Sequence, residues 1–314
     1  MAVATKYGYG VNSDSYEAAI NATYKMAEKI ARQVIRNVTT TDRLALFNKE
    51  PINNGVTVEE VVVGLLEAQG YSGSVTAFAN KATVNLYVKY YSDWTRCKFA
   101  TTVDEKEIRK VMLSDNPAET LANKITSALV ESDKQDKYER LLGLFDYASK
   151  VPVSGDPDFV SGNTDPRAMI KIGTAIDLSA DGGYKKLLTA IKNTISGMKF
   201  VNTTFNKAGM KRSTFADDIV MLMPYKVKNA LDVNELAAIF NLEKDKLDAR
   251  IVDVDVDGKV YIVDRNAILM LTRLYRMTSW FNPDELYMNF WLHVERMYAI
   301  SLLWDCCFIE VTNA

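Results

Sequence analysis

The middle of the chain carries a run of helix-forming residues that is unusually long for a single element. From Asn116 to Lys150 it reads NPAETLANKITSALVESDKQDKYERLLGLFDYASK, with Asn116 as N-cap, Pro117 at the first helical position and Glu119 completing a capping box. Apolar residues return at helical spacing, first at Leu121, Ile125, Ala128 and Leu129 and then at Tyr138, Leu141, Leu142 and Phe145. A helix of this span would run on the order of 50 Å, well beyond the usual length of about 3–4 turns. The pattern therefore predicts a strut, and the rest of the fold must be arranged along it.

The segments before the strut predict two helices and a hairpin. Apolar residues between Asp14 and Ile35 follow helical spacing and leave a charged opposite face, which predicts an amphipathic helix. In TVEEVVVGLLEAQGYSG, a capping box of Thr57 and Glu60 predicts a second helix. The next segment, ATVNLYVKYYSDWTRCKFATTV, is rich in Val, Tyr, Phe and Thr, and it predicts a long hairpin that turns near Ser92-Asp93.

After the strut, VPVSGDPDFVSGNTDP is dense in Pro, Gly, Ser and Asp and marks an internal boundary. Beyond it the elements alternate, which predicts a compact α/β subdomain from about Asp165 to Met277. Its expected parts are a strand at Ala168–Ile172, a helix from Gly183 to about Phe200, a strand in DDIVMLM, short helices in YKVKNAL and NELAAIFN, and a helix in NAILMLTRLYRM. The aromatic tail DELYMNFWLHVERMYAISLLWDCCFIEV predicts one or two long strands.

The stretch IVDVDVDGKVYIVD permits two interpretations. Asp253, Asp255, Asp257, Gly258 and Asp264 have the spacing of a calcium-binding loop. The strict alternation with valine and the Asp257-Gly258 pair instead favour two strands joined by a tight turn, with the aspartates on the solvent face. We expect the hairpin without bound calcium, and the calcium loop is the alternative.

The chain lacks the residues that most enzyme mechanisms need. His293, the single histidine, lies in the strand-like run FWLHVER, and we expect a half-buried strand residue there. Cys306-Cys307 lacks the spacing of a redox pair and has no basic neighbours, and no phosphate-binding glycine loop is present. We therefore expect no catalytic residues, no cofactor and no metal site.

Net charge and hydropathy further narrow the class of protein that this sequence can encode. The net charge of −2 differs from that of a strongly basic nucleic-acid binder, although one aromatic and basic cluster could stack on single strands or form a cross-strand contact. That cluster comprises Tyr87, Lys89, Tyr90, Trp94, Arg96 and Lys98. Three cysteines do not make a disulfide framework, and neither a secretory start nor a membrane-length apolar run is present. We expect a soluble protein made inside a cell, without a membrane partner.

The order of these parts resembles that of the major capsid proteins of tailed bacteriophages, whose Hong Kong 97-like fold is shared with encapsulins. In that family an N-terminal arm precedes an extended loop, a long spine helix and a compact axial domain, and the chain ends in peripheral strands. The run from TFADDIVMLMPYKVKNALDVNELAAIFN to IVDVDVDGKVYIVDRNAILML is similar to the axial region of capsid proteins in small Gram-positive phages. Asn282-Pro283 then precedes the final strands, as it does there.

The resemblance implies an α+β fold in five parts. They are an N-terminal arm with an amphipathic helix at 1–57, an extended-loop hairpin region at 58–115, a peripheral domain with the spine helix at 116–164, an axial domain at 165–277 and C-terminal peripheral strands at 278–314. It also implies a non-catalytic subunit that assembles as hexamers and pentamers of itself into an icosahedral head shell.

The implied shell encloses double-stranded DNA through weak non-specific contact, and scaffolding, portal and decoration proteins are further candidate partners. The expected location is the virion, after assembly in the host bacterial cytoplasm. Two alternatives stay open: an encapsulin-like compartment shell, and a calcium-binding or nucleic-acid-binding adaptor that uses the aspartates of residues 253–264.

Overall fold

The computed structural model describes residues 44–52, 55–66, 84–104, 117–233, 249–256, 258–282, 284 and 287–313. The helix predicted between Asp14 and Ile35 and the one predicted in NELAAIFN lie outside the described residues. No helix among the described residues is long and apolar enough to cross a membrane.

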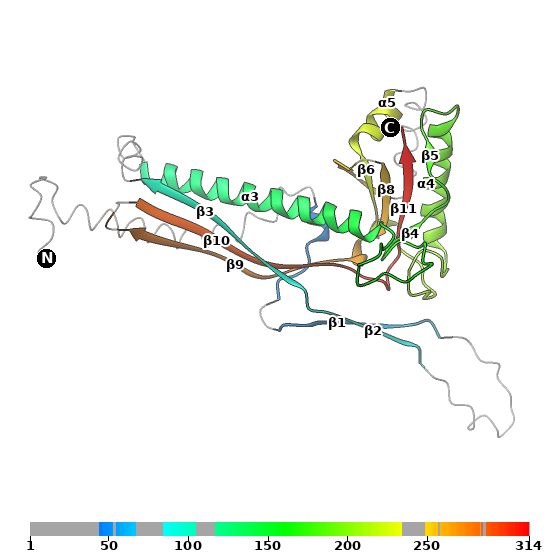
Figure 1. Ribbon diagram of the computed structural model, residues 1–314, viewed down its shortest axis with the longest axis horizontal. Coiled ribbons are helices and arrows are strands. Elements are labelled where there is room, and N and C mark those ends of the chain that lie inside the picture. Colours follow the sequence, from blue (N-terminus) through cyan, green and yellow to red (C-terminus); the bar gives the residue numbers. More distant parts are fainter. Residues whose placement is uncertain are drawn as a thin grey trace, which may run out of the picture.

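The predicted strut is confirmed as helix α3, Pro117–Ala148, with 32 residues. It lies along a three-stranded sheet in the order β3 (Trp94–Asp104), β10 (Tyr287–Ile300) and β9 (Ile268–Asn282) (Figure 1). Ile125, Leu129 and Val130 of the helix form one apolar core with side chains of these strands, including Val103, Phe290 and Leu292. The helix and this sheet together make an elongated platform.

The helix predicted in NAILMLTRLYRM is wrong, because this segment is the start of strand β9. Leu and Met favour helices locally, but β9 pairs antiparallel with β10 along its whole length, and that pairing outweighs the local preference. The register shifts by one residue between Glu295 and Arg296, which leaves Arg273 of β9 in a β-bulge. A short 3₁₀ helix, η6 (Arg265–Ala267), leads into the strand.

The second layer of the molecule is a lobe built on a six-stranded sheet. Its main path runs β4 (Ile170–Lys171), β11 (Cys306–Thr312), β8 (Lys259–Asp264), β6 (Ile219–Pro224) and β7 (Arg250–Val254), and β5 (Ile176–Asp177) pairs with β11. Helices α4 (Gly183–Lys199) and α5 (Tyr225–Val233) and the 3₁₀ turn η4 (Ala216–Asp218) complete the lobe. The predicted strands near 170 and 220, the helix at 183 and the helix in YKVKNAL are confirmed.

Both faces of this sheet are buried, which explains its continuous apolar strands. On one face, Met221 and Ile262 pack against Leu187 and Ile191 of α4. On the other face, alternate residues such as Tyr261 and Leu222 meet the end of α3 and the 3₁₀ turn η2 (Ala45–Phe47); Phe145 and Phe47 are among the contacting residues. The strut is therefore packed against both the platform sheet and the lobe.

The predicted Asp257-Gly258 hairpin is wrong, although both of its strands exist. β6 lies between β7 and β8, pairing parallel with β7 and antiparallel with β8. Gly258 has a φ of +74°, and its carbonyl accepts a hydrogen bond from the backbone of Val311 in β11 at 2.8 Å. The alternation does not place all aspartates on a solvent face either, because Asp264 is buried. A local turn signal cannot reveal that a third strand inserts between two neighbours in sequence.

An extended ribbon exists, but it is formed by a different pair of segments from the one predicted. Val58–Val63 is strand β1 rather than a helix, and it pairs antiparallel with β2 (Leu86–Tyr91). β2 does not pair with β3, because β3 joins β10 in the platform. Three successive valines favour the strand over the helix that the capping box suggested. The β1–β2 ribbon projects away from the rest of the molecule (Figure 1).

Candidate functional site

The ribbon presents an apolar face to solvent. Its register places Val61 opposite Val88 and Val63 opposite Leu86, with Tyr90 next along the same face. Val61, Val63 and Leu86 are 51–58% exposed, and Tyr90 is 62% exposed. A two-stranded ribbon is marginally stable by itself, and contiguous exposed apolar side chains mark interaction surfaces. This face is the strongest candidate for a contact with another macromolecule.

Glu60 anchors the ribbon through its opposite face. The carboxylate accepts hydrogen bonds from Tyr91 Oη at 2.9 Å, Ser301 Oγ at 2.7 Å and Trp304 Nε1 at 2.6 Å. Burial, together with the neighbouring Glu60 charge, raises the pKa of Tyr91. Ser301 and Trp304 belong to the connection between β10 and β11, so Glu60 fixes the ribbon to the point where the platform meets the lobe.

A second anchor is built around the bulged Arg273. Its guanidinium donates to Glu295 Oε1 at 2.6 Å and to the Gly55 carbonyl at 2.8 Å, and it lies 4.6 Å from the centre of the Trp94 ring. Trp94 Nε1 in turn donates to the Val56 carbonyl at 2.6 Å. The chain entering β1 and the chain leaving β2 are thus held to the same end of the platform, where Trp94 of β3 lies opposite Met297 of β10 and Met297 lies opposite Leu271 of β9.

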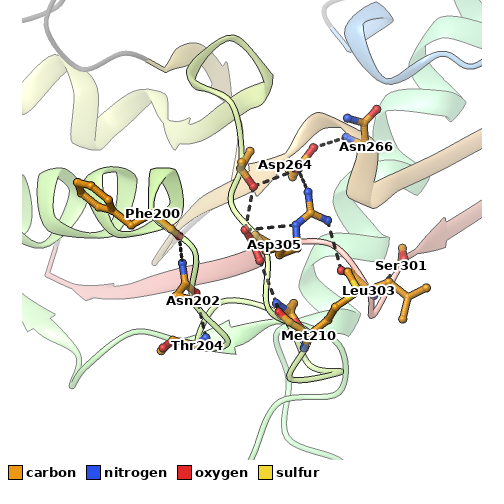
Figure 2. A network of polar contacts seen from close by, with 12 residues as sticks. Phe200, Asn202, Thr204, Met210, Asp264, Asn266, Ser301, Leu303 and Asp305 are labelled. Atoms are coloured by element: carbon orange, nitrogen blue, oxygen red, sulfur yellow. Dashed lines mark hydrogen bonds and ion pairs between the residues drawn. The ribbon is translucent and has the colours of Figure 1, made fainter. Parts of the chain in front are cut away.

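A buried polar network joins the lobe to the platform (Figure 2). Asp264 ends β8 and Asp305 precedes β11, so they stand at the two places where the chain passes between the sheets. Arg212 donates to Asp264 at 2.8 Å, and Thr214 Oγ1 lies 3.1 Å from Asp264 and 2.8 Å from Asp305. The Arg212 guanidinium also stacks 3.9 Å from the centre of the Trp304 ring. Through Trp304 this network meets the ribbon anchor at Glu60.

The aspartates of the calcium alternative are engaged elsewhere. Asp253 accepts from Lys228 Nζ at 2.6 Å, Asp255 is exposed, and Asp257 lies outside the described residues. Asp264 uses one oxygen for Arg212 and Thr214 and the other for the backbone N–H of Asn266. In the described part of the chain, no three His, Cys, Asp or Glu side chains gather as a metal site.

The register of β6 keeps the first and last aspartates of that loop apart. Asp253 lies opposite Met223 of β6, and Asp264 lies opposite Ile219. These two positions are about 13 Å apart along the strand. The spacing along the sequence therefore does not become the geometry of a calcium loop.

His293 occupies the half-buried strand position expected from the sequence, and the paired cysteines are buried. His293 is a partly buried residue of β10, and its Nε2 lies 3.0 Å from Thr278 Oγ1. Cys306 and Cys307 are buried in β11, and burial raises the pKa of both thiols, which disfavours the reactive thiolate.

The structure splits the aromatic and basic cluster between two sheets. Tyr87, Lys89 and Tyr90 lie on β2 of the ribbon, whereas Trp94, Arg96 and Lys98 lie on β3 of the platform. The apolar ribbon face was missed because β1 was predicted as a helix. The sequence signal that could have indicated a strand there is the run of three valines, Val61–Val63.

Comparisons with known proteins all point to one class. Residues 7–310 match the family model described as Phi29-like phage major capsid protein. The chain is 23% identical over 293 residues to the major capsid protein of Bacillus phage GA-1, covering 88% of this chain and 58% of that protein. It is 22% identical over 306 residues to the major capsid protein of Streptococcus phage Cp-1, covering 92% of this chain and 82% of that protein. The chain thus spans less than two thirds of the length of the GA-1 relative.

The fold of this chain is also similar to that of solved phage capsid structures. The capsid structure of Staphylococcus phage Andhra matches with a TM-score of 0.61 at 12% identity, covering 85% of this chain and 83% of that chain. The α+β fold is therefore that of Hong Kong 97-like phage capsid proteins, as the resemblance implied.

Proposed function

The chain belongs to the family of Phi29-like phage major capsid proteins, and we propose that it self-assembles into the icosahedral shell of a phage head that encloses double-stranded DNA. The role is structural and non-catalytic, and hexamers and pentamers of the same chain build the shell. The subunit assembles in the host bacterial cytoplasm and resides in the virion. Family membership favours this function over the encapsulin-like shell and over the adaptor.

The observation that carries the proposal is the exposed apolar face of the β1–β2 ribbon. Val61, Val63, Leu86 and Val88 lie together on this face, in two cross-strand pairs. Fully burying one Val or Leu side chain contributes roughly 1.5–3 kcal/mol, so covering this face with a second copy contributes several kcal/mol per contact. A shell multiplies such modest contacts by its symmetry.

The anchors at the ribbon base support the same interpretation. Glu60 and Arg273 fix where the ribbon points relative to the platform, so an attached neighbour would adopt a defined orientation. We propose that the ribbon docks on a different patch of the neighbouring copy, so that the contact is heterologous. Such contacts generate closed rings when the rotation between copies closes, and rings of five and six are the units of a shell.

The proposed domains of the subunit correspond to the ribbon, the platform sheet and the lobe sheet. We propose that the extended loop centres on β1 and β2, that the peripheral domain is the platform of α3, β3, β10 and β9, and that the axial domain is the lobe. β9 continues through residue 277 and β11 joins the lobe sheet. The axial domain accordingly comprises about residues 165–264 together with 306–313, in place of 165–277.

The test replaces apolar side chains of the ribbon face and leaves the anchors Glu60 and Arg273 unchanged. In Val61→Ser/Val88→Ser, the ribbon keeps Glu60 and its partners but loses its central exposed pair. We expect large particles to disappear from sedimentation profiles and from negative-stain images, while the circular dichroism of the subunit is unchanged. Val153→Ser/Val160→Ser, two exposed valines of the loop after α3, is the matched control and should still assemble. Equal assembly by both variants would contradict the proposal.

A further inference from the structure

Two buried carboxyl groups meet at the joint between the lobe and the platform (Figure 2). Asp264 and Asp305 are 1% and 0% exposed, and Thr214, whose hydroxyl touches both, is also buried. The Thr214 Oγ1 atom lies 3.1 Å from Asp264 Oδ2 and 2.8 Å from Asp305 Oδ2. The backbone N–H of Asp264 also donates to the Asp305 carbonyl at 2.8 Å. This carboxyl pair therefore joins the two chain passages between the sheets.

The hydroxyl of Thr214 cannot donate to both carboxyl groups of the pair. A threonine hydroxyl has one proton to donate and two lone pairs that accept, whereas an ionised carboxylate only accepts. If both aspartates were ionised, one contact would press a hydroxyl oxygen against a carboxylate oxygen with no proton between them. If one carboxyl is protonated, it donates to Thr214 Oγ1 and Thr214 donates to the other carboxylate. Both contacts are then hydrogen bonds.

The charges in contact with the pair also favour one bound proton. Arg212 Nη2 donates to Asp264 Oδ2 at 2.8 Å. Arg212 Nε lies 3.7 Å from Asp305 Oδ2, which is too far for a hydrogen bond. Asp305 Oδ1 instead accepts from the uncharged amide of Asn206 at 3.2 Å. Two ionised carboxylates beside one guanidinium would leave a buried negative charge uncompensated, which is costly, whereas one proton makes the cluster neutral.

Other charged and titratable groups surround the pair without replacing that proton. Lys49 Nζ donates to Asn266 Oδ1 at 3.1 Å, and Arg265 Nε donates to the Leu46 carbonyl at 3.0 Å, so these hydrogen bonds of both cations go elsewhere. Burial raises the pKa of Asp264, although the charge of Arg212 acts in the opposite direction. The remaining groups around the pair are Asp218 before β6, Glu60 of β1 and the thiols of Cys306 and Cys307.

We propose that Asp264 and Asp305 share one proton through Thr214, and that this proton holds the joint between the lobe and the platform closed. The pair titrates as a unit. Either carboxyl can hold the proton, because both arrangements leave one ionised carboxylate to balance Arg212. Loss of the proton leaves the buried negative charge uncompensated and favours opening of the joint. The device belongs to the single subunit and does not depend on assembly.

The same contacts connect the joint to the ribbon. The Arg212 guanidinium stacks on the Trp304 ring, and Trp304 Nε1 donates to the Glu60 carboxylate that anchors β1. An opening that moves Arg212 therefore also disturbs the base of the ribbon. Protonation of the carboxyl pair thus controls how firmly the lobe and the ribbon are held to the platform.

The expected pH dependence follows from the proton that opening releases. In the open joint water reaches the pair, and Asp264 ionises at its ordinary pKa of 3.8. The closed joint is therefore most favoured below that pH. Above it, the equilibrium constant for opening rises by up to about tenfold per pH unit, until the closed pair itself loses the proton.

Amide hydrogen exchange of the peptides that contain Asp264 and Asp305 measures this opening in the full-length chain. The variant Asp305→Asn leaves one carboxylate beside one guanidinium, which needs no bound proton. We expect the ratio of exchange rates, parent chain over Asp305→Asn, to rise by up to about tenfold per pH unit. Comparing the two chains at each pH cancels the intrinsic pH dependence of exchange. The control Asp217→Asn removes the same charge from an exposed position of η4 and should behave as the parent does.

Infrared spectroscopy of the parent chain detects the proton even if a variant fails to fold. A protonated carboxyl has a carbonyl stretching band that ionised carboxylates lack. We expect this band in the parent at neutral pH and in Asp217→Asn, and its loss in Asp264→Asn and in Asp305→Asn. Absence of the band from the parent at neutral pH would overturn the inference. An exchange ratio of the parent to Asp305→Asn that does not change with pH would overturn it as well.

Discussion

Asp133 of the strut helix and Arg296 of β10 form a bidentate ion pair, at 2.6 and 2.7 Å, with both side chains buried. The pair fixes the helix on the platform sheet at one register. Removing one partner leaves a buried charge without compensation, which typically costs about 3–5 kcal/mol. We expect Asp133→Ala to lower the free energy of unfolding by that amount in urea titrations. The double replacement Asp133→Leu/Arg296→Met should recover most of the loss; no recovery would show that the charges themselves are required.

Lys137 lies one turn along the same helix and should make stability depend on pH. Burial, with repulsion from Arg296, lowers its pKa from 10.5 to about 7. Between these values the unfolded chain binds a proton that the folded chain does not, so the stability contributed by this group rises with pH from about 7 toward 10.5. We expect Lys137→Met to be more stable than wild type by a few kcal/mol at pH 6, with a gap that narrows at pH 9. A stability difference between Lys137→Met and wild type that does not depend on pH would contradict the lowered pKa of Lys137.

The ribbon anchor is tested by two adjacent glutamates on opposite faces of β1. Glu60→Ala leaves the donors Trp304 Nε1 and Ser301 Oγ without their acceptor, each at a cost of about 1–3 kcal/mol where burial is complete. We expect faster amide exchange across β1 and β2 and impaired assembly. Glu59→Ala loses only an exposed hydrogen bond from Tyr90 and should leave amide exchange across the ribbon unchanged. Equal amide-exchange rates in Glu60→Ala and Glu59→Ala would contradict an anchoring role for Glu60.

Two glycines in helices should respond to alanine in opposite ways. A Cβ on Gly183 would lie 2.3 Å from the Asp177 carbonyl oxygen, so Gly183→Ala must displace backbone and should destabilise the lobe by about 1–3 kcal/mol. Gly143 of α3 has nothing within 4 Å of that position, and Gly143→Ala should stabilise by about 0.5–1 kcal/mol through helix propensity. Thermal melts of both variants measure these changes. A melting temperature that rises in Gly183→Ala and falls in Gly143→Ala would contradict the prediction.

Local patterns predicted the elements whose causes are local. The cap, the first-position proline and the apolar spacing of residues 116–150 predict α3, and Gly183 to Lys199 follows the same logic. β9 and β1 were wrongly predicted as helices because their strand structure depends on partners distant in sequence. Ile268 pairs with Ile300, and Val58 pairs with Tyr91. A helix-like run cannot reveal such partners.

The candidate surfaces were predictable to different degrees. The extended ribbon was expected from the family order, but its strands were assigned to the wrong segments. The Asp-Gly signal failed because β6, from earlier in the chain, inserts between β7 and β8.

The most direct test of shell formation is sedimentation of the purified wild-type chain, followed by negative-stain imaging of the fast fraction. The proposed function predicts closed particles, many subunits in mass, at concentrations where the Val61→Ser/Val88→Ser variant sediments as a single 35.2 kDa chain. A wild-type chain that stays strictly monomeric at high protein concentration would contradict the account.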